Sequence, residues 1–76
     1  MDPEVMKMFA VGLSAGLGML GPALAIGLIG YSALTGISRN PEASGPIGTN
    51  MILVTAFAEA IAIYVLIIAI ILAMVA

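Results

Sequence analysis

The residue best suited to chemistry in this sequence is a single carboxylic acid, Glu59. It lies in a stretch, residues 47–76, that contains no other charged side chain. Because about 20 consecutive apolar residues can cross the hydrocarbon core of a bilayer, Glu59 is expected well inside the membrane. Placing an acid near the centre of a membrane helix costs about 2.5–3.5 kcal/mol, so we interpret Glu59 as a functional residue that needs a partner.

The chemistry available to such an acid is the uptake and release of a proton. An isolated carboxylate in a medium of low dielectric constant takes up a proton instead of remaining charged. The same group would release that proton on meeting water or a fixed cation. Moving one elementary charge through the membrane potential is worth about 2.3 kcal/mol per 100 mV, so repeated cycles can be coupled to motion. The alternative is a neutral acid that only joins helices through a hydrogen bond.

The composition indicates that the chain is surrounded by lipid. Hydrophobic residues make up 63% of its 76 residues, and six charged side chains could not cover the surface of a soluble domain. The sequence has no cysteine, no histidine and no basic cluster, so it offers no thiolate, disulfide or histidine–metal chemistry and no nucleic-acid interface. We expect no cofactor or metal. The charged residues are Asp2, Glu4, Lys7, Arg39, Glu42 and Glu59.

Two long apolar helices must position Glu59, in an all-α membrane fold. We expect them at about 3–38 and 46–76, joined by a loop at about 39–45, within one domain that covers residues 1–76. The first helix is longer than a hydrocarbon core of about 30 Å, so it must tilt or extend into the headgroups. The short loop predicts that the two helices form an antiparallel transmembrane hairpin.

The loop carries the strongest local signals. Asn40 as N-cap, Pro41 at the first helical position and Glu42 in the first turn predict the start of the second helix. Pro46 would then lie inside that helix, so its regular part is expected to begin just beyond Pro46. Arg39 has two interpretations: it biases the loop toward the cytoplasmic side, or it contacts a soluble partner.

Small residues recur along the first helix at spacings that place them on one face. In membranes, small faces let helix backbones approach and pack. A second group of small residues at 21–27 makes the helix thin on several sides at one level, so several neighbouring helices could pack there. The other helix of the hairpin supplies only one such neighbour. We therefore expect identical chains to associate. The residues of the face are Gly12, Gly16, Ala23, Gly27, Gly30 and Ala33.

Folding the hairpin about its loop pairs residues whose numbers sum to about 83. This brings Glu59, which lies in a hollow of small residues on its own helix, level with Ala23, Leu24 and Ala25 on the first helix. Thr55 and Tyr64 are possible supports for the acid. From the residues alone, the simpler interpretations are a packing role for Tyr64 and a backbone hydrogen bond for Thr55. The hollow consists of Ala56, Ala58, Ala60 and Ala62.

Two segments give the sequence a specific family resemblance. They are the loop Arg39-Asn40-Pro41-Glu42-Ala43 and the stretch Ala58-Glu59-Ala60-Ile61-Ala62-Ile63-Tyr64. With a glycine-rich first helix between the N-terminus and this loop, nearly the whole chain closely resembles the c subunit of F-type ATP synthases. The family loop usually reads Arg-Gln-Pro, so Asn40 is a mild departure.

The resemblance implies that identical hairpins form a ring, with the first helix inside and the second outside. Glu59 would bind the translocated ion and, during rotation of the ring, pass an essential arginine of the neighbouring a subunit. The loop at Arg39, Asn40 and Pro41 would contact the central stalk, and Tyr64 would support the acid. The chain would then be a non-catalytic rotor component, in contact with lipid, in a multi-pass arrangement in a bacterial plasma membrane.

The choice of ion follows from comparison with sodium-binding members of that family. These resemble one another in a glutamine on the first helix and a hydroxyl residue directly after the acid. The matching positions here are Ile26 and Ala60, and neither side chain offers an oxygen, whereas a hard cation needs several oxygen ligands. We therefore expect protons. Ala23, Ala25, Ile26, Ala60 and Tyr64 form the expected surroundings of Glu59.

Three other functions compete with a proton-carrying ring. The first is a sodium-translocating ring. The second is a small pore-forming or holin-like hairpin, which would need a continuous polar stripe along a helix that faces a lumen, and the sequence offers one isolated acid. The third is a hairpin scaffold within a larger complex, for which replacing Glu59 by glutamine would preserve function.

Overall fold

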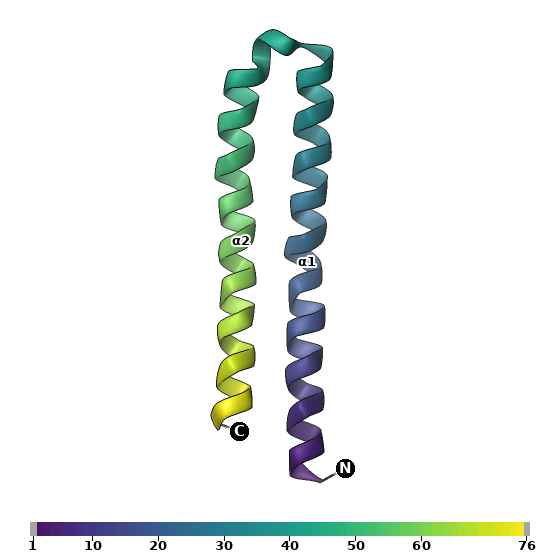
Figure 1. Cartoon of the computed structure of the whole chain (residues 1–76), viewed down its shortest axis with the longest axis vertical. Helices are drawn as coiled ribbons and strands as arrows, with labels where there is room; N and C mark the ends of the chain where they lie inside the picture. Colours follow the sequence, from purple (N-terminus) through teal and green to yellow (C-terminus); the bar gives the residue numbers. More distant parts are fainter. Residues whose placement is uncertain (1, 76) are drawn as a thin grey trace.

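The computed structural model describes residues 2–75, which form two long helices folded against each other (Figure 1). Helix α1 spans Pro3–Arg39, a short 3-10 helix, η1, spans Pro41–Ala43, and helix α2 spans Ser44–Val75. The Cα atoms extend over 58 × 17 × 8 Å, the shape of a rod. Both helices are long and apolar enough to cross a membrane, so the expected two-helix hairpin is confirmed.

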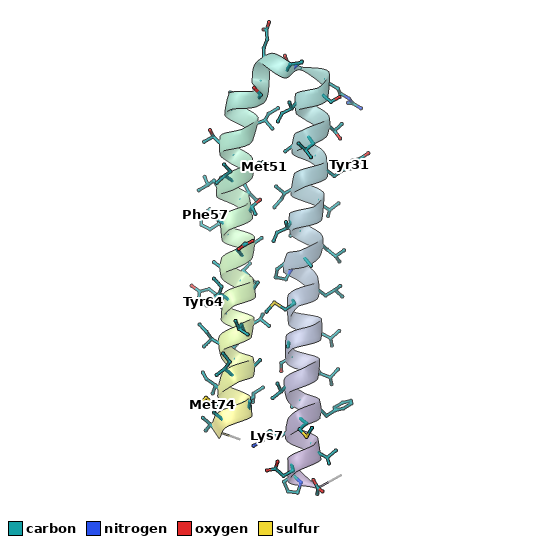
Figure 2. All side chains as sticks on the ribbon, viewed as in Figure 1. Lys7, Tyr31, Met51, Phe57, Tyr64 and Met74 are labelled. Atoms are coloured by element: carbon teal, nitrogen blue, oxygen red, sulfur yellow. The ribbon has the colours of Figure 1, made fainter. Side chains whose placement is uncertain are left out.

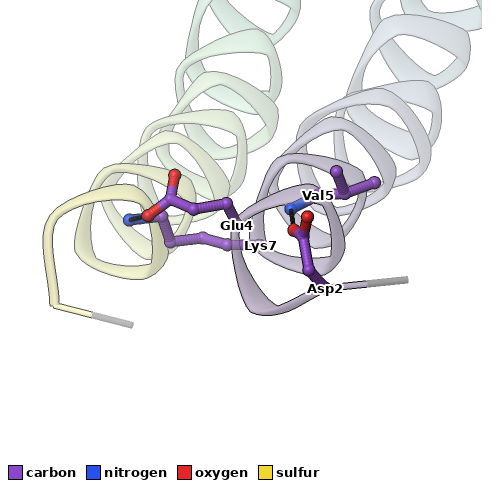
Figure 3. Close-up of polar contacts among 4 residues, drawn as sticks. All are labelled: Asp2, Glu4, Val5 and Lys7. Atoms are coloured by element: carbon purple, nitrogen blue, oxygen red, sulfur yellow. Dashed lines mark hydrogen bonds and ion pairs between the residues drawn. The ribbon is translucent and has the colours of Figure 1, made fainter.

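The start of α1 follows from its first residues (Figure 3). The Asp2 carboxylate accepts a hydrogen bond from the Val5 backbone N–H at 2.8 Å, and Pro3 occupies the first helical turn. This cap satisfies one of the N–H groups that a helix start leaves without a partner. One turn later Lys7 Nζ lies 3.9 Å from Glu4 Oε1. The N-terminal turn is therefore fixed by local polar contacts.

The loop is tighter than the sequence suggested, and the second helix starts earlier. The Asn40 N–H bonds to the Gly36 carbonyl at 3.0 Å, which closes α1, and Pro41 then opens the 3-10 turn. The Asn40 side chain makes no capping bond, and α2 begins at Ser44. Pro46 fits because it is the third residue of α2, where a backbone N–H has no acceptor within the helix. Asn40 and Pro41 thus open the 3-10 turn, and the regular α-helix begins at Ser44, two residues before the start expected at about 46.

Small residues fill the seam between the two helices. A Cβ atom built on Gly18 would lie 2.5 Å from Val65 Cγ1, and one on Gly36 would lie 3.1 Å from Ile47 Cδ1. The residue numbers of both pairs sum to 83, so the predicted register is correct. Close approach of backbones is what allows helices to pack in lipid. The buried residues of this inter-helix seam are Pro22, Ala33, Ala58 and Ala69.

The large apolar side chains point outward instead of into a core (Figure 2). Leu24, Leu28 and Tyr31 on α1 are 59%, 67% and 74% exposed, and the seam holds only small buried side chains. A soluble protein would bury such residues, because apolar surface in water is unfavourable. The arrangement suits a hairpin surrounded by acyl chains and by other copies of itself.

Candidate functional site

Glu59 lies at the centre of the second span. It is the sixteenth of the thirty-two residues of α2, counted from Ser44, and its side chain is exposed at the surface of the single hairpin. Within residues 2–75, its carboxyl group makes no hydrogen bond or ion pair. An acid at mid-depth without a partner in its own chain must find one in a neighbour, in water or by taking up a proton.

Two apolar grooves meet at Glu59, one on each side of it along the hairpin. The groove toward the loop is lined by Ile26, Gly30, Met51, Ile52, Thr55, Ala56 and Glu59. The groove toward the chain termini is lined by Met19, Pro22, Ala23, Ile26, Glu59, Ala62, Ile63 and Leu66. Both grooves contain residues of α1 and of α2, so the acid sits where the two helices meet. We call this side of the hairpin the Glu59 edge.

The structure brings only part of the expected site together. Ala23 and Ile26 line the grooves beside Glu59, as expected. Ala25 and Ala60 line neither groove, although both were expected around the acid. The reason is helical periodicity, because successive residues of an α-helix turn by about 100°. The side chain of Ala60 therefore points in a different direction from that of Glu59, and the side chain of Ala25 in a different direction from that of Ala23.

Tyr64 lies on a different face from the acid. Tyr64 follows Glu59 by five positions, so the two side chains point in directions about 140° apart around the helix. In Figure 2 its ring extends away from α1, and its side chain is 64% exposed. It follows Asn50 by fourteen residues, which places both on one face of α2. Asn50 lines an apolar groove nearer the loop that does not include Glu59. We call this second side the Tyr64 edge.

Thr55 is the polar neighbour that the sequence analysis undervalued. Its side chain lines the loop-side groove together with Glu59. The hydroxyls of Ser14 and Thr49 donate to carbonyl oxygens one turn earlier, at 2.7 and 3.0 Å. The Thr55 hydroxyl makes no such bond in the described part of the chain. The four-residue spacing from Glu59 was the available signal, since residues at that spacing share a helix face.

The small face of α1 is open. Nothing lies within 4 Å of a Cβ atom built on Gly12, Gly16, Gly27 or Gly30. These glycines and Ala23 fall within an arc of about 60° on α1, and Ala23 and Gly30 line the Glu59 grooves. We call these five residues the open stripe. Ala33, which the sequence analysis assigned to the same face, is instead buried in the seam, because its direction differs from theirs.

The loop residues form the exposed end of the rod. Arg39, Asn40 and Pro41 are exposed, as is Glu42, and they connect the ends of the two helices (Figure 1). Arg39 and Glu42 form no ion pair with each other or with any other residue from 2 to 75. Their charged groups are therefore accessible at one tip of the molecule.

Two antiparallel membrane helices, a lone acid at mid-depth and an open stripe of small residues define a class of protein. They describe a small membrane hairpin that carries an ionisable group inside the bilayer and presents a packing face to further chains. Comparison with known proteins identifies which family within that class is involved.

A model of the ATP synthase C-subunit family matches residues 9–72. The chain is 54% identical over 76 residues to the ATP synthase c subunit of Dehalococcoides mccartyi, with both sequences covered in full. It is 44% identical over 71 residues to that of Geobacter metallireducens, covering 93% of this chain and 78% of the relative. It is 42% identical over 66 residues to that of Chloroflexus aurantiacus, covering 87% of each.

The chain belongs to the family of ATP synthase c subunits. It is thus a membrane component of an F-type ATP synthase, and the role of the family is that of a building block of the rotor ring. The loop and the acid on which the resemblance was based, Arg39 to Ala43 and Ala58 to Tyr64, both lie within the matched residues.

Proposed function

We propose that this chain carries protons as one unit of a homo-oligomeric rotor ring, with Glu59 as the group that binds and releases them. The observation that supports this most directly is an unpaired acid at the midpoint of α2, exposed where the two helices meet. Such a group is neutral when it faces lipid and ionises beside water or a cation. Its protonation state therefore depends on its position, which is what coupling to rotation requires.

The two edges of the hairpin support closure into a ring. The Glu59 edge presents the acid and the open stripe, whereas the Tyr64 edge presents Tyr64 and Asn50. A contact between two different surfaces of identical chains is heterologous, and it forms a ring when the rotation from copy to copy closes on itself. Glu59 of one copy would then meet the Tyr64 edge of the next copy. Support for the acid by Tyr64 comes, in this arrangement, from the adjacent copy.

The scarcity of oxygen atoms favours a proton over sodium. In the two grooves, the side-chain oxygens belong to Glu59 and Thr55, and the position of Ile26 contributes only hydrocarbon. A hard cation takes several oxygen ligands at once. A proton requires only the carboxylate itself and a hydrogen-bond partner, so this donor set suits a proton.

The other expected partners are the a subunit, the central stalk and lipid, and each matches one exposed part of the hairpin. As the ring turns, Glu59 would pass a fixed cation, the arginine of the a subunit, which favours the ionised form of the acid. The loop at Arg39, Asn40 and Pro41 is exposed at one end of the rod and would contact the central stalk. The exposed leucines and isoleucines would contact lipid. Bacterial relatives favour the plasma membrane as the location.

Glu59→Gln tests the proposal, because glutamine has a similar shape and cannot ionise. We expect the variant ring to assemble and ATP-driven proton pumping by the complete synthase in membrane vesicles to be abolished. Glu42→Gln, which removes the loop acid, is the matched control and should retain pumping. Pumping by Glu59→Gln at the unaltered rate would rule out the carrier role and favour a scaffold.

Sodium protection tests the choice of ion separately. A carbodiimide modifies the protonated acid, so a cation that occupies the site slows the reaction. We expect the rate of Glu59 modification at fixed pH to be the same in sodium as in potassium at equal ionic strength. Slower modification in sodium would overturn the proton assignment and leave the ring role intact.

A further inference from the structure

The carboxyl group of Glu59 needs a hydrogen-bond partner in both of its protonation states. When ionised it accepts hydrogen bonds, and when neutral it also donates one. A polar group left without a partner in an apolar medium is strongly disfavoured. A carrier that alternates between these states inside a membrane is best served by a neighbour that both donates and accepts.

Thr55 is placed to be that neighbour. Among residues 2–75, Thr55 and Glu59 are the two residues lining these grooves whose side chains carry an oxygen atom. Residues four apart on a helix have Cβ atoms about 5–6 Å from each other. Helical side chains also lean toward the N-terminus of their helix, so the long side chain of Glu59 leans toward the turn that holds Thr55.

The hydroxyl of Thr55 is also available. Thr49 lies on the same helix and donates to the Gly45 carbonyl at 3.0 Å, which satisfies its hydroxyl within its own backbone. Thr55 makes no corresponding bond in the described chain. The other lining residues of the loop-side groove offer only hydrocarbon, a thioether or no side chain. Glu59 is the other residue lining this groove whose side chain carries polar atoms.

We propose that Thr55 is a positioning residue that hydrogen-bonds the Glu59 carboxyl group in both protonation states. This inference rests on the proton-carrying function proposed above. Rotation of the hydroxyl lets Thr55 donate to the carboxylate and accept from the carboxylic acid without movement of the backbone. It also holds the carboxyl group toward the loop side of the hairpin, so that each turn of the ring presents the acid in the same orientation.

The test is the pH dependence of carbodiimide modification of Glu59 in the assembled ring. Thr55→Val keeps the shape of the side chain and removes the hydroxyl. A hydrogen bond favours the charged carboxylate more than the neutral acid, so its loss lets the reactive acid persist to higher pH. We expect the midpoint of the modification profile to rise by roughly half a unit to one unit.

Two controls separate positioning from structure. Thr55→Ser keeps the hydroxyl and should keep the original profile, and Thr49→Val removes a hydroxyl that is already bonded to backbone and should do the same. An unchanged or lowered midpoint in Thr55→Val would overturn the role of Thr55. The proton-carrying function would survive that result, since it stands or falls on the Glu59→Gln pumping experiment.

A measurement on the unaltered ring covers the case in which Thr55→Val fails to assemble. The infrared carbonyl stretch of protonated Glu59 reports whether the acid is hydrogen-bonded. We expect the carbonyl band of the unaltered chain and of Thr55→Ser at the frequency of a hydrogen-bonded carboxylic acid. A band at the frequency of a free carboxylic acid in the unaltered chain would refute the proposal without any change at residue 55.

Discussion

Two sets of glycines on α1 have opposite surroundings. Gly18 and Gly36 face α2, where a Cβ atom would lie 2.5 Å from a Val65 methyl and 3.1 Å from an Ile47 methyl respectively. Gly12 and Gly16 belong to the open stripe, where a Cβ atom would meet nothing within 4 Å. Glycine therefore allows the two helices to approach within the chain at Gly18 and Gly36, whereas Gly12 and Gly16 face open space.

The difference shows what one hairpin can and cannot satisfy by itself. The inter-helix seam is formed within a single chain, where Pro22 and Ala33 of α1 and Ala58 and Ala69 of α2 are buried. In the open stripe, no atom of α2 lies within 4 Å of a Cβ atom built on any of the four glycines. Glycine in the interior of a helix costs about 0.8–1.0 kcal/mol relative to alanine, so an uncovered glycine is a loss unless another backbone packs against it. The stripe therefore points to a second copy as its partner.

The largest effect is expected from filling the open stripe. Gly16→Leu adds a large side chain where the single hairpin has open space, about two helical turns from Ala23 and the Glu59 grooves. It would prevent a neighbouring backbone from approaching, so we expect the assembled ring to disappear while the helix content of the hairpin is retained. Native gel electrophoresis of the detergent-extracted protein measures the first effect, and circular dichroism measures the second.

Gly45→Leu is the matched control for that substitution. Gly45 also has nothing within 4 Å of a Cβ atom, and it lies in the first turn of α2 beside the loop, outside the stripe. The ring should persist in this variant. A ring that tolerates Gly16→Leu as well would show that the stripe is not an interface and would remove the argument drawn from the two glycine sets.

The fold was predictable to a large extent from the sequence, because each helix is encoded locally. Two long uncharged runs separated by a polar loop predict a hairpin in lipid, and the loop position fixes the register that Gly18 and Val65 display. The start of α2 was less predictable. Asn40, Pro41 and Pro46 carry overlapping start signals, and the choice between them depends on the geometry of the tight turn at residues 41–43.

The candidate site was predictable only in part. Glu59 stands out because a charge in an apolar run is costly wherever it packs. Its neighbours depend on direction around each helix, which sequence proximity does not give. Ala60 is adjacent to Glu59 in sequence and lines neither groove, whereas Ile26 on the other helix lines both. The role proposed for Tyr64 requires a second copy, because a single hairpin places Tyr64 on a different face of α2 from Glu59.

A smaller effect is expected from crowding the seam. Gly18→Ala would place a methyl group 2.5 Å from Val65 Cγ1 and 3.0 Å from Cγ2. Valine is stiff about its χ1 angle, so the helices must separate locally. Such overpacking costs about 1–3 kcal/mol, offset in part by the better helix propensity of alanine, about 0.8–1.0 kcal/mol. We expect a lower free energy of unfolding of the hairpin, measured by titration with a denaturing detergent.

The pair Gly18 and Val65 allows the cause of that loss to be isolated. If the clash with Val65 is responsible, Val65→Ala should be less harmful in the Gly18→Ala background than in the original chain, which a double-mutant cycle measures directly. Gly36→Ala is the internal comparison, because the flexible end of Ile47 at 3.1 Å can move aside and the variant should be nearly neutral. Equal losses at Gly18 and Gly36 without coupling to Val65 would mean that the seam tolerates wider helix separation. The contrast between a closed seam and an open stripe would then rest on the stripe alone.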